Sequence, residues 1–297
     1  MDDATLGALR NAASAVFDIG FAGMVGALAT LALLADTSSD WAARGARRSR
    51  RLFMQANVLA LAASVAWMAV QSVALSDGPP LAAIEAVGGI VTDTSFGHAW
   101  AIATSLLAAC ALLAHVKRWR PMPLRWLGVG VTLVAVAHAN NSHAGANGLG
   151  WQLPTMTVHL LATGLWAGAV FAAVLAVWRH APHAVDGPRY ARRLSRLATA
   201  ALVAVAVTGV ASAWHGLGGS FAPLASVDAS TWGFMLDAKL VLVGVAVALG
   251  AFNRLAVMPS LPAAWPRFAR VLRIEAVVLL AVLVAAAWLA NGEPPAV

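Results

Sequence analysis

The stretch VAHANNSHAGANGLGWQLPTMTVHLLATGLW, residues 136–166, decides how the rest of the sequence is understood. It holds three histidines, His138, His143 and His159, and it contains no charged residue. Long apolar segments lie on both sides of it, which predicts a hairpin between two membrane helices. A histidine at the depth of a bilayer is costly to bury and is a candidate functional residue. Three histidines around one turn therefore predict a metal or cofactor site.

The composition is that of an integral membrane protein. Of the 297 residues, 60% are hydrophobic and 11% are charged, whereas a soluble domain has about 25% charged residues. The single cysteine, Cys110, lies in an apolar run and cannot form an intrachain disulfide. The sequence has no phosphate-binding glycine loop, Cys-x-x-Cys pair or haem c attachment motif. An ATP-driven pump is therefore excluded for this chain alone.

The fold class predicted is an all-α bundle of eight transmembrane helices in a single domain, residues 1–297. A span needs about 20 mostly apolar residues. Eight windows qualify, at roughly 13–35, 52–75, 97–116, 124–141, 155–178, 196–215, 232–256 and 269–290. The acidic start of the chain is unlike a signal peptide, so we expect the first window to be a retained span.

The basic residues predict the orientation of the helices. Eighteen of the 20 Lys and Arg residues lie in the connecting segments near 36–51, 117–125, 179–196 and 254–273, and the alternate segments have none. By the positive-inside rule the arginine-rich segments are cytoplasmic and both termini are outside. The net charge of +7 comes mainly from these basic segments, which we expect to contact anionic lipid headgroups. We expect no nucleic acid partner.

This orientation places five histidines on the outer side of the membrane, which are His98, His138, His143, His159 and His215. Met156 lies one turn before His159 and shares its helix face. Imidazole suits Cu(II) and a thioether suits Cu(I). The sequence therefore predicts a metal or cofactor site from these five histidines and Met156, and these donor types fit copper as either Cu⁺ or Cu²⁺.

Four charged residues inside the predicted spans bear on this site or on packing, which are Asp18, Asp237, Lys239 and Glu275, and Asp237 and Lys239 are two residues apart and so point to different helix faces. Asp18 and Lys239 are both in the outer third of the bilayer, so Lys239 either reaches the interface or pairs across helices with Asp18. Either charge could support the metal site. Glu275 lies near the inner end of its span with Arg254, Arg270 and Arg273 close in sequence or depth, and we expect a structural ion pair there.

Small residues predict close helix packing at two places. The first span has Gly20, Gly23 and Gly26, and the fifth has Gly164 and Gly168. Glycines at such spacing let helix backbones approach one another.

Five segments follow one another in an order that resembles the copper resistance D (CopD) family of bacterial inner-membrane proteins. They are SHAG (142–145), TVHLLATGLWAGAV (157–170), RRLSRLATAALVAVAVTGVASAW (192–214), DAKLVLVGVAVALGAFNR (237–254) and RVLRIEAVVLLAVLVAAAWLA (270–290). The resemblance covers roughly residues 120–290, and the first four spans match loosely. The family motifs fall on His143, His159 and Lys239.

The resemblance implies a multi-pass protein of the bacterial cell inner membrane that takes up copper and catalyses no reaction. It also implies a periplasmic copper-binding partner of the copper resistance C type. Two alternatives remain open from the residues. The histidines could ligate haem b in an electron-transfer or cytochrome assembly protein, or the chain could be a scaffold that holds a copper carrier without transport.

Overall fold

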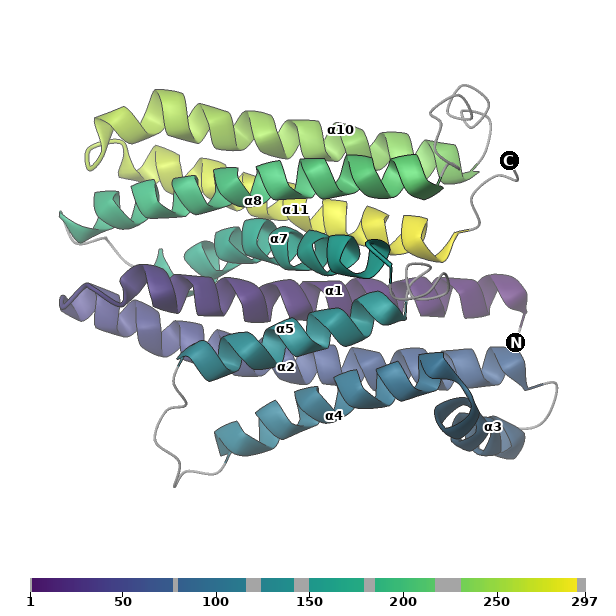
Figure 1. The fold of residues 1–297 in the computed structure, drawn as a ribbon. Coiled ribbons are helices and arrows are strands. Elements are labelled where there is room, and N and C mark those ends of the chain that lie inside the picture. Colours follow the sequence, from purple (N-terminus) through teal and green to yellow (C-terminus); the bar gives the residue numbers. More distant parts are fainter. Residues whose placement is uncertain are drawn as a thin grey trace.

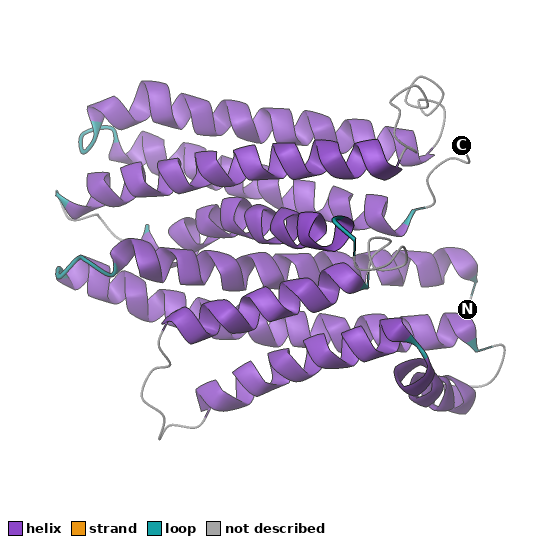
Figure 2. Ribbon diagram, in the orientation of Figure 1, coloured by secondary structure: helices purple, strands orange, loops and turns teal. Residues whose placement is uncertain are grey.

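The structure, a computed structural model, describes residues 2–76, 80–115, 124–141, 150–178, 185–216 and 231–292. Every regular element in these ranges is a helix, as Figures 1 and 2 show, so the all-helical prediction is confirmed. The helices of the bundle are α1 (Asp3–Leu34), α2 (Asp40–Leu75), α4 (Ser95–His115), α5 (Leu124–Asn140), α7 (Gln152–Ala172), α8 (Asp186–Gly216), α10 (Thr231–Phe252) and α11 (Trp265–Asn291).

Three short elements modify this pattern. The π-helical turn η1 (Ala173–Val177) continues α7, and η2 (Asn253–Val257) continues α10 before the 3-10 turn η3 (Met258–Ser260). A further helix, α3 (Pro80–Asp93), follows α2. This helix lies between two of the predicted windows, and its 14 residues are too few to cross a bilayer.

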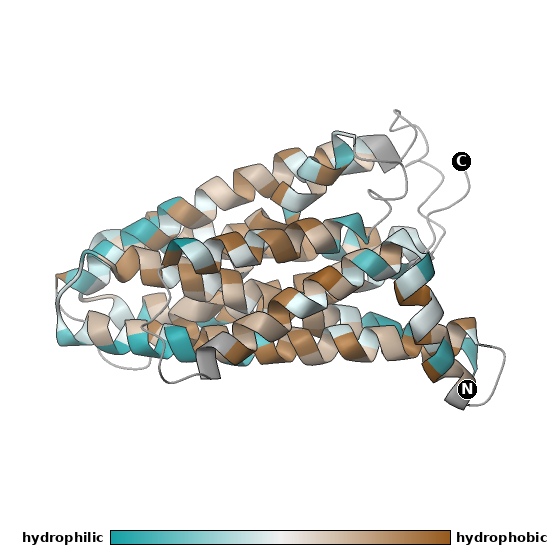
Figure 3. Ribbon diagram, turned by 60° about the horizontal axis from the view of Figure 1, so that its bottom comes forward, coloured by the Kyte–Doolittle hydropathy of each residue, from teal (hydrophilic) through white to brown (hydrophobic). Residues whose placement is uncertain are grey.

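Seven of the described helices are long and apolar enough to cross a membrane. They coincide with seven of the predicted windows. The remaining window, 124–141, corresponds to α5, whose 17 residues stand at the lower end of the length that spans a bilayer. Figure 3 shows apolar segments along the middle of the bundle and more hydrophilic residues toward its ends.

The start of α1 and the end of α11 lie side by side. The Arg10 side chain donates to the Asn291 carbonyl (3.4 Å), and the Asn291 amide donates to the Ser14 hydroxyl (3.0 Å). Figure 1 accordingly shows the start of α1 and the end of α11 at the same end of the bundle. We call this the terminal end, and the other, where α1 meets α2 and α10 meets α11, the hairpin end.

Helix α1 occupies the centre of the bundle, where it packs against α2, α5, α7, α8 and α11. Its closest approach is to α7, because a Cβ on Gly26 would overlap the backbone at Gly168, and a Cβ on Gly168 would overlap the Ala22 carbonyl. On the α2 side, a Cβ on Gly20 would lie 2.8 Å from the Ala60 nitrogen. The prediction of close glycine packing is confirmed.

Polar and aromatic contacts fix α8 against the rest of the hairpin end. The Tyr190 hydroxyl and the Thr30 hydroxyl, both buried, are 3.1 Å apart. Trp178 packs edge-on against Tyr190 and Trp265. The Arg193 guanidinium donates to the Leu33 carbonyl at the end of α1 (3.1 Å), where a cation also meets the negative end of the helix dipole.

Candidate metal centre

A cavity of about 310 Å³ opens in the terminal half of the bundle, between α1, α2, α4, α5, α7, α10 and α11. We call it the histidine cavity. Its lining includes five of the residues that the sequence singles out, which are Asp18, His138, Met156, His159 and Lys239. Five aromatic residues complete much of the wall, which are Phe17, Phe21, Trp67, Phe96 and Trp100. The fold therefore brings a few polar groups together in an apolar chamber, as ligand sites generally do.

His159 enters the cavity from the second turn of α7, and its ring is held by α8. The Nδ1 atom lies 2.9 Å from the Thr208 hydroxyl oxygen. That hydroxyl also lies 2.6 Å from the Ala204 carbonyl, its helical neighbour four residues earlier. A carbonyl can only accept, so the single hydroxyl proton of Thr208 goes to Ala204.

The Thr208 oxygen then accepts a hydrogen bond from the Nδ1–H group of His159. In the neutral imidazole the ring proton is then on Nδ1, and the lone pair of Nε2 is available for a ligand. Metal-binding histidines are oriented in the same manner, by donating the other ring N–H to a fixed acceptor. Thr208 was not predicted as a site residue from the sequence, although a hydroxyl inside the apolar window 196–215 could have indicated a polar role.

His138 lies near the end of α5 and contacts α1. Its ring stacks on Phe17, with centroids 4.3 Å apart and an interplanar angle of 24°. The Nε2 atom lies 4.0 Å from an oxygen of the Asp18 carboxylate. A carboxylate at this distance attracts a cation held by the imidazole.

Lys239 and Asp18 face the same cavity from α10 and α1. No ion pair within 4.0 Å joins these two side chains. In the cavity, the Asp18 carboxylate would therefore attract a bound cation, and the Lys239 ammonium would repel it.

Unpartnered polar atoms also border the cavity. Asn141 Oδ1 and Thr163 Oγ1 are buried and have no hydrogen-bond partner, and both residues line the chamber. Buried polar atoms are nearly always paired. A bound ion or water in the cavity would satisfy them.

The other predicted ligands are placed differently. His98 lies on α4, is exposed, and is not among the cavity residues. His143, and the side chain of His215, lie outside the described residues. Within the described ranges no three His, Cys, Asp or Glu side chains form a group that could hold a metal ion. A complete ligand set would therefore need Met156 or side chains outside the described residues, such as those of His143 and His215.

Two family models match this chain. The copper resistance protein D-like N-terminal domain matches residues 1–152, more than half of the chain, and copper resistance protein D matches residues 188–289. The chain belongs to the copper resistance protein D family. The resemblance stated from the sequence motifs is thus confirmed.

One relative illustrates the distance within this family. Copper resistance protein D of Pseudomonas syringae pv. tomato is 29% identical over 229 residues, which cover 69% of this chain and 71% of that protein. No solved structure matches the chain. Membership of the copper resistance protein D family supports a role in copper resistance or transport by a multi-pass membrane protein.

Proposed function

We propose that the protein binds copper in the histidine cavity and transfers it inward across the bacterial inner membrane. The observation that carries this proposal is the bond between His159 and Thr208, which leaves His159 Nε2 free beside the cavity. Neutral imidazole with an exposed lone pair is a ligand for copper. Copper is here the cargo of the protein, and no reaction is catalysed.

The donor set suits either oxidation state. The imidazoles of His138 and His159 are ligands for Cu²⁺, and the thioether of Met156 favours Cu⁺. His143 comes after α5 in the sequence, and His215 lies in the last turn of α8. In this proposal both histidines complete the ligand set, and the exposed His98 serves at the entrance to the site. In this scheme Asp18 attracts the ion, and Lys239 weakens its binding enough to permit release.

The proposed topology has eight spans with both termini in the periplasm. Helix α5 would be the fourth span in chain order and would raise the count from seven to eight. An even number of crossings is required, because α11 ends at the same end of the bundle where α1 begins. The arginine-rich connections at the hairpin end would then face the cytoplasm. The histidine cavity would open toward the periplasm, where a copper-binding protein of the copper resistance C type would deliver the ion.

Copper binding by the purified full-length protein tests the site. We expect about one copper per chain, measured by metal analysis after loading and removal of excess ion. The His159→Ala variant should bind copper more weakly by about 100-fold or more, because losing a partner that only orients a ligand already costs about 10–100-fold. The double variant His180→Ala/His183→Ala is the control, because the sequence places both histidines at the opposite, arginine-rich end.

Equal affinity in His159→Ala and the control would refute the site. An absorbance spectrum of the same sample tests the haem alternative, since a Soret band without copper would indicate haem b. Copper uptake into proteoliposomes tests the scaffold alternative, because a scaffold would bind copper without moving it.

A further inference from the structure

A second cavity, of about 280 Å³, lies in the hairpin half of the bundle between α7, α8, α10 and α11. Helix α8 packs on α7, and α10 packs on α11, whereas α8 and α10 make little contact with each other. The cavity occupies the space between them. Its walls are mostly apolar, and we call it the Glu275 cavity because that residue lines it.

Glu275 is the only charged side chain among the buried residues of the described ranges, at 4% exposure. The sequence predicted an ion pair with a nearby arginine, and this prediction is wrong. Among the described residues the Glu275 carboxyl has no ion pair or hydrogen bond. The reason is geometric, because Arg270 and Arg273 are exposed on other faces of α11, and Arg254 bonds elsewhere.

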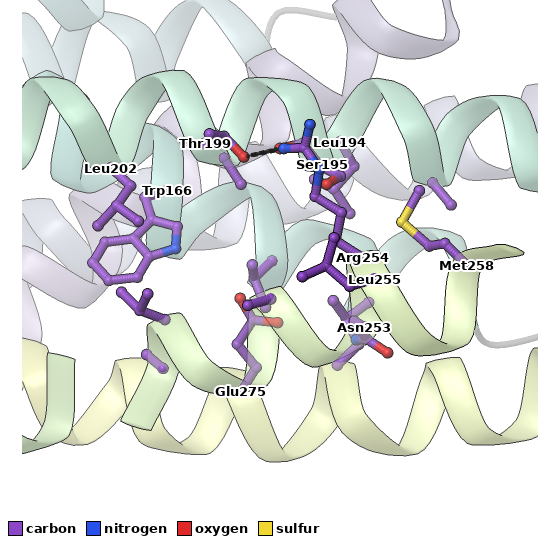
Figure 4. Close-up of a pocket in the computed structure, with 18 of the residues that line it drawn as sticks. Trp166, Leu194, Ser195, Thr199, Leu202, Asn253, Arg254, Leu255, Met258 and Glu275 are labelled. Atoms are coloured by element: carbon purple, nitrogen blue, oxygen red, sulfur yellow. Dashed lines mark hydrogen bonds between the residues drawn. The ribbon is translucent and has the colours of Figure 1, made fainter. Parts of the chain in front are cut away.

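Arg254 is held by α8 instead. Its guanidinium donates to the Thr199 hydroxyl at 2.7 Å. Figure 4 shows this bond, and it shows Glu275 reaching from α11 into the same cavity. Apart from Glu275, Arg254 is the only charged or titratable residue among those that line the cavity from α7, α8, α10 and α11.

Asn253 provides an independent sign of a missing ligand. It lines the same cavity and is 4% exposed, and neither its amide nitrogen nor its amide oxygen has a partner. It begins the π-helical turn η2, a distortion that occurs frequently at functional sites. The cavity has room for several water molecules, which could bridge Asn253 and Glu275.

We propose that the Glu275 cavity is a proton-binding site, in which the Glu275 carboxyl reversibly takes a proton and Arg254 neutralises the carboxylate after the proton leaves. An unpaired carboxylate is too costly to bury, so the group binds a proton in the arrangement described here. On release, the proton passes to water in the cavity. The guanidinium then leaves Thr199 and pairs with the carboxylate.

A proton suits this cavity better than a metal cation. Calcium and magnesium need six or more oxygen ligands, and the side-chain oxygens here are those of Glu275, Asn253, Ser195 and Thr199. Thr199 is already committed to Arg254 and to the Ser195 carbonyl. The permanent positive charge of Arg254 further opposes a metal ion.

The carboxyl also has space to act. Gly250 of α10 faces it, and a Cβ there would lie 3.3 Å from Glu275 Oε1. The site is separate from the histidine cavity, so its test does not depend on copper binding.

Infrared spectroscopy of the purified full-length protein in lipid tests the proposal. At neutral pH we expect the carbonyl band of a protonated carboxylic acid, which shifts in deuterated water and disappears as the pH is raised. The Glu275→Gln variant should lose this band. Asp18→Asn should keep it, which separates Glu275 from the carboxyl of the histidine cavity, and Glu85→Gln is the control at an exposed carboxyl.

The Arg254→Gln variant tests the counter-charge. Removing a cation that stabilises the carboxylate should raise the midpoint of the titration by about 1 pH unit. The Glu275→Gln variant should elute as the unsubstituted protein does in size-exclusion chromatography and unfold at a similar temperature, which shows that the variant is folded.

Two outcomes would overturn the proposal. One is a band that persists unchanged in Glu275→Gln. The other is a carboxylate signal in the unsubstituted protein that responds to sodium and not to pH. An unchanged midpoint in Arg254→Gln would overturn the role of that residue.

Discussion

The contact between α1 and α7 makes a sharp prediction, because two glycines meet there through their backbones. A methyl group at residue 168 would overlap the Ala22 carbonyl and approach the Gly26 nitrogen. No flexible side chain is available to yield, so the two helices must separate by on the order of 1 Å to restore normal contact distances. Gly244 of α10 is the matched control, since a methyl group there meets nothing within 4 Å.

The magnitude follows from comparing the two alanine variants. Overpacking a close contact costs about 1–3 kcal/mol. Replacing a helical glycine by alanine gains up to about 1 kcal/mol from helix propensity, and this gain is common to both positions. The free energy of unfolding of Gly168→Ala should therefore fall below that of Gly244→Ala by about 1–3 kcal/mol.

Reversible unfolding in mixed detergent measures this difference. A functional consequence should accompany it, because α1 and α7 also hold Asp18 and His159 at the histidine cavity. These residues lie eight or nine positions from the glycine contact, about 12–14 Å along the helix axes. We expect weaker copper binding in Gly168→Ala and unchanged binding in Gly244→Ala. Equal stability of the two variants would refute the argument from backbone contact.

Two further predictions concern single hydrogen bonds. The Thr208→Val variant should bind copper about fivefold more weakly, because the His159 ring loses its acceptor; fivefold is the equivalent of one hydrogen bond of about 1 kcal/mol. The Thr208→Ser variant keeps the hydroxyl and should bind copper as the unsubstituted protein does. A copper titration of both variants measures the difference. The Tyr190→Phe variant should lose about 1–2 kcal/mol of stability, because it removes the buried partner of Thr30. Thermal unfolding measures that loss, and a variant as stable as the parent would contradict it.

Hydropathy alone identified the membrane class and located the helices. Seven predicted windows correspond to helices long enough to span a bilayer, because about 20 consecutive apolar residues have few alternatives to a membrane helix. The glycine spacing in the first and fifth spans likewise predicted a close contact that the fold contains. Motif order was sufficient to recognise the family, since the copper resistance protein D models match most of the chain.

The candidate site was only partly accessible from the sequence. Charge alternation grouped the histidines on one side of the membrane, and the cavity does bring His138, Met156 and His159 together with Asp18 and Lys239. That these residues bind copper stays a prediction.

Only the tertiary structure decided which polar groups meet. It paired His159 with Thr208, left His98 outside the cavity, and left Glu275 without the arginine partner expected for it. The physical reason is that these helices are apolar on nearly every face, so periodicity does not fix how each is rotated or which helices are neighbours. Those choices are made by backbone contacts such as that of Gly26 with Gly168, which act between segments more than 100 residues apart.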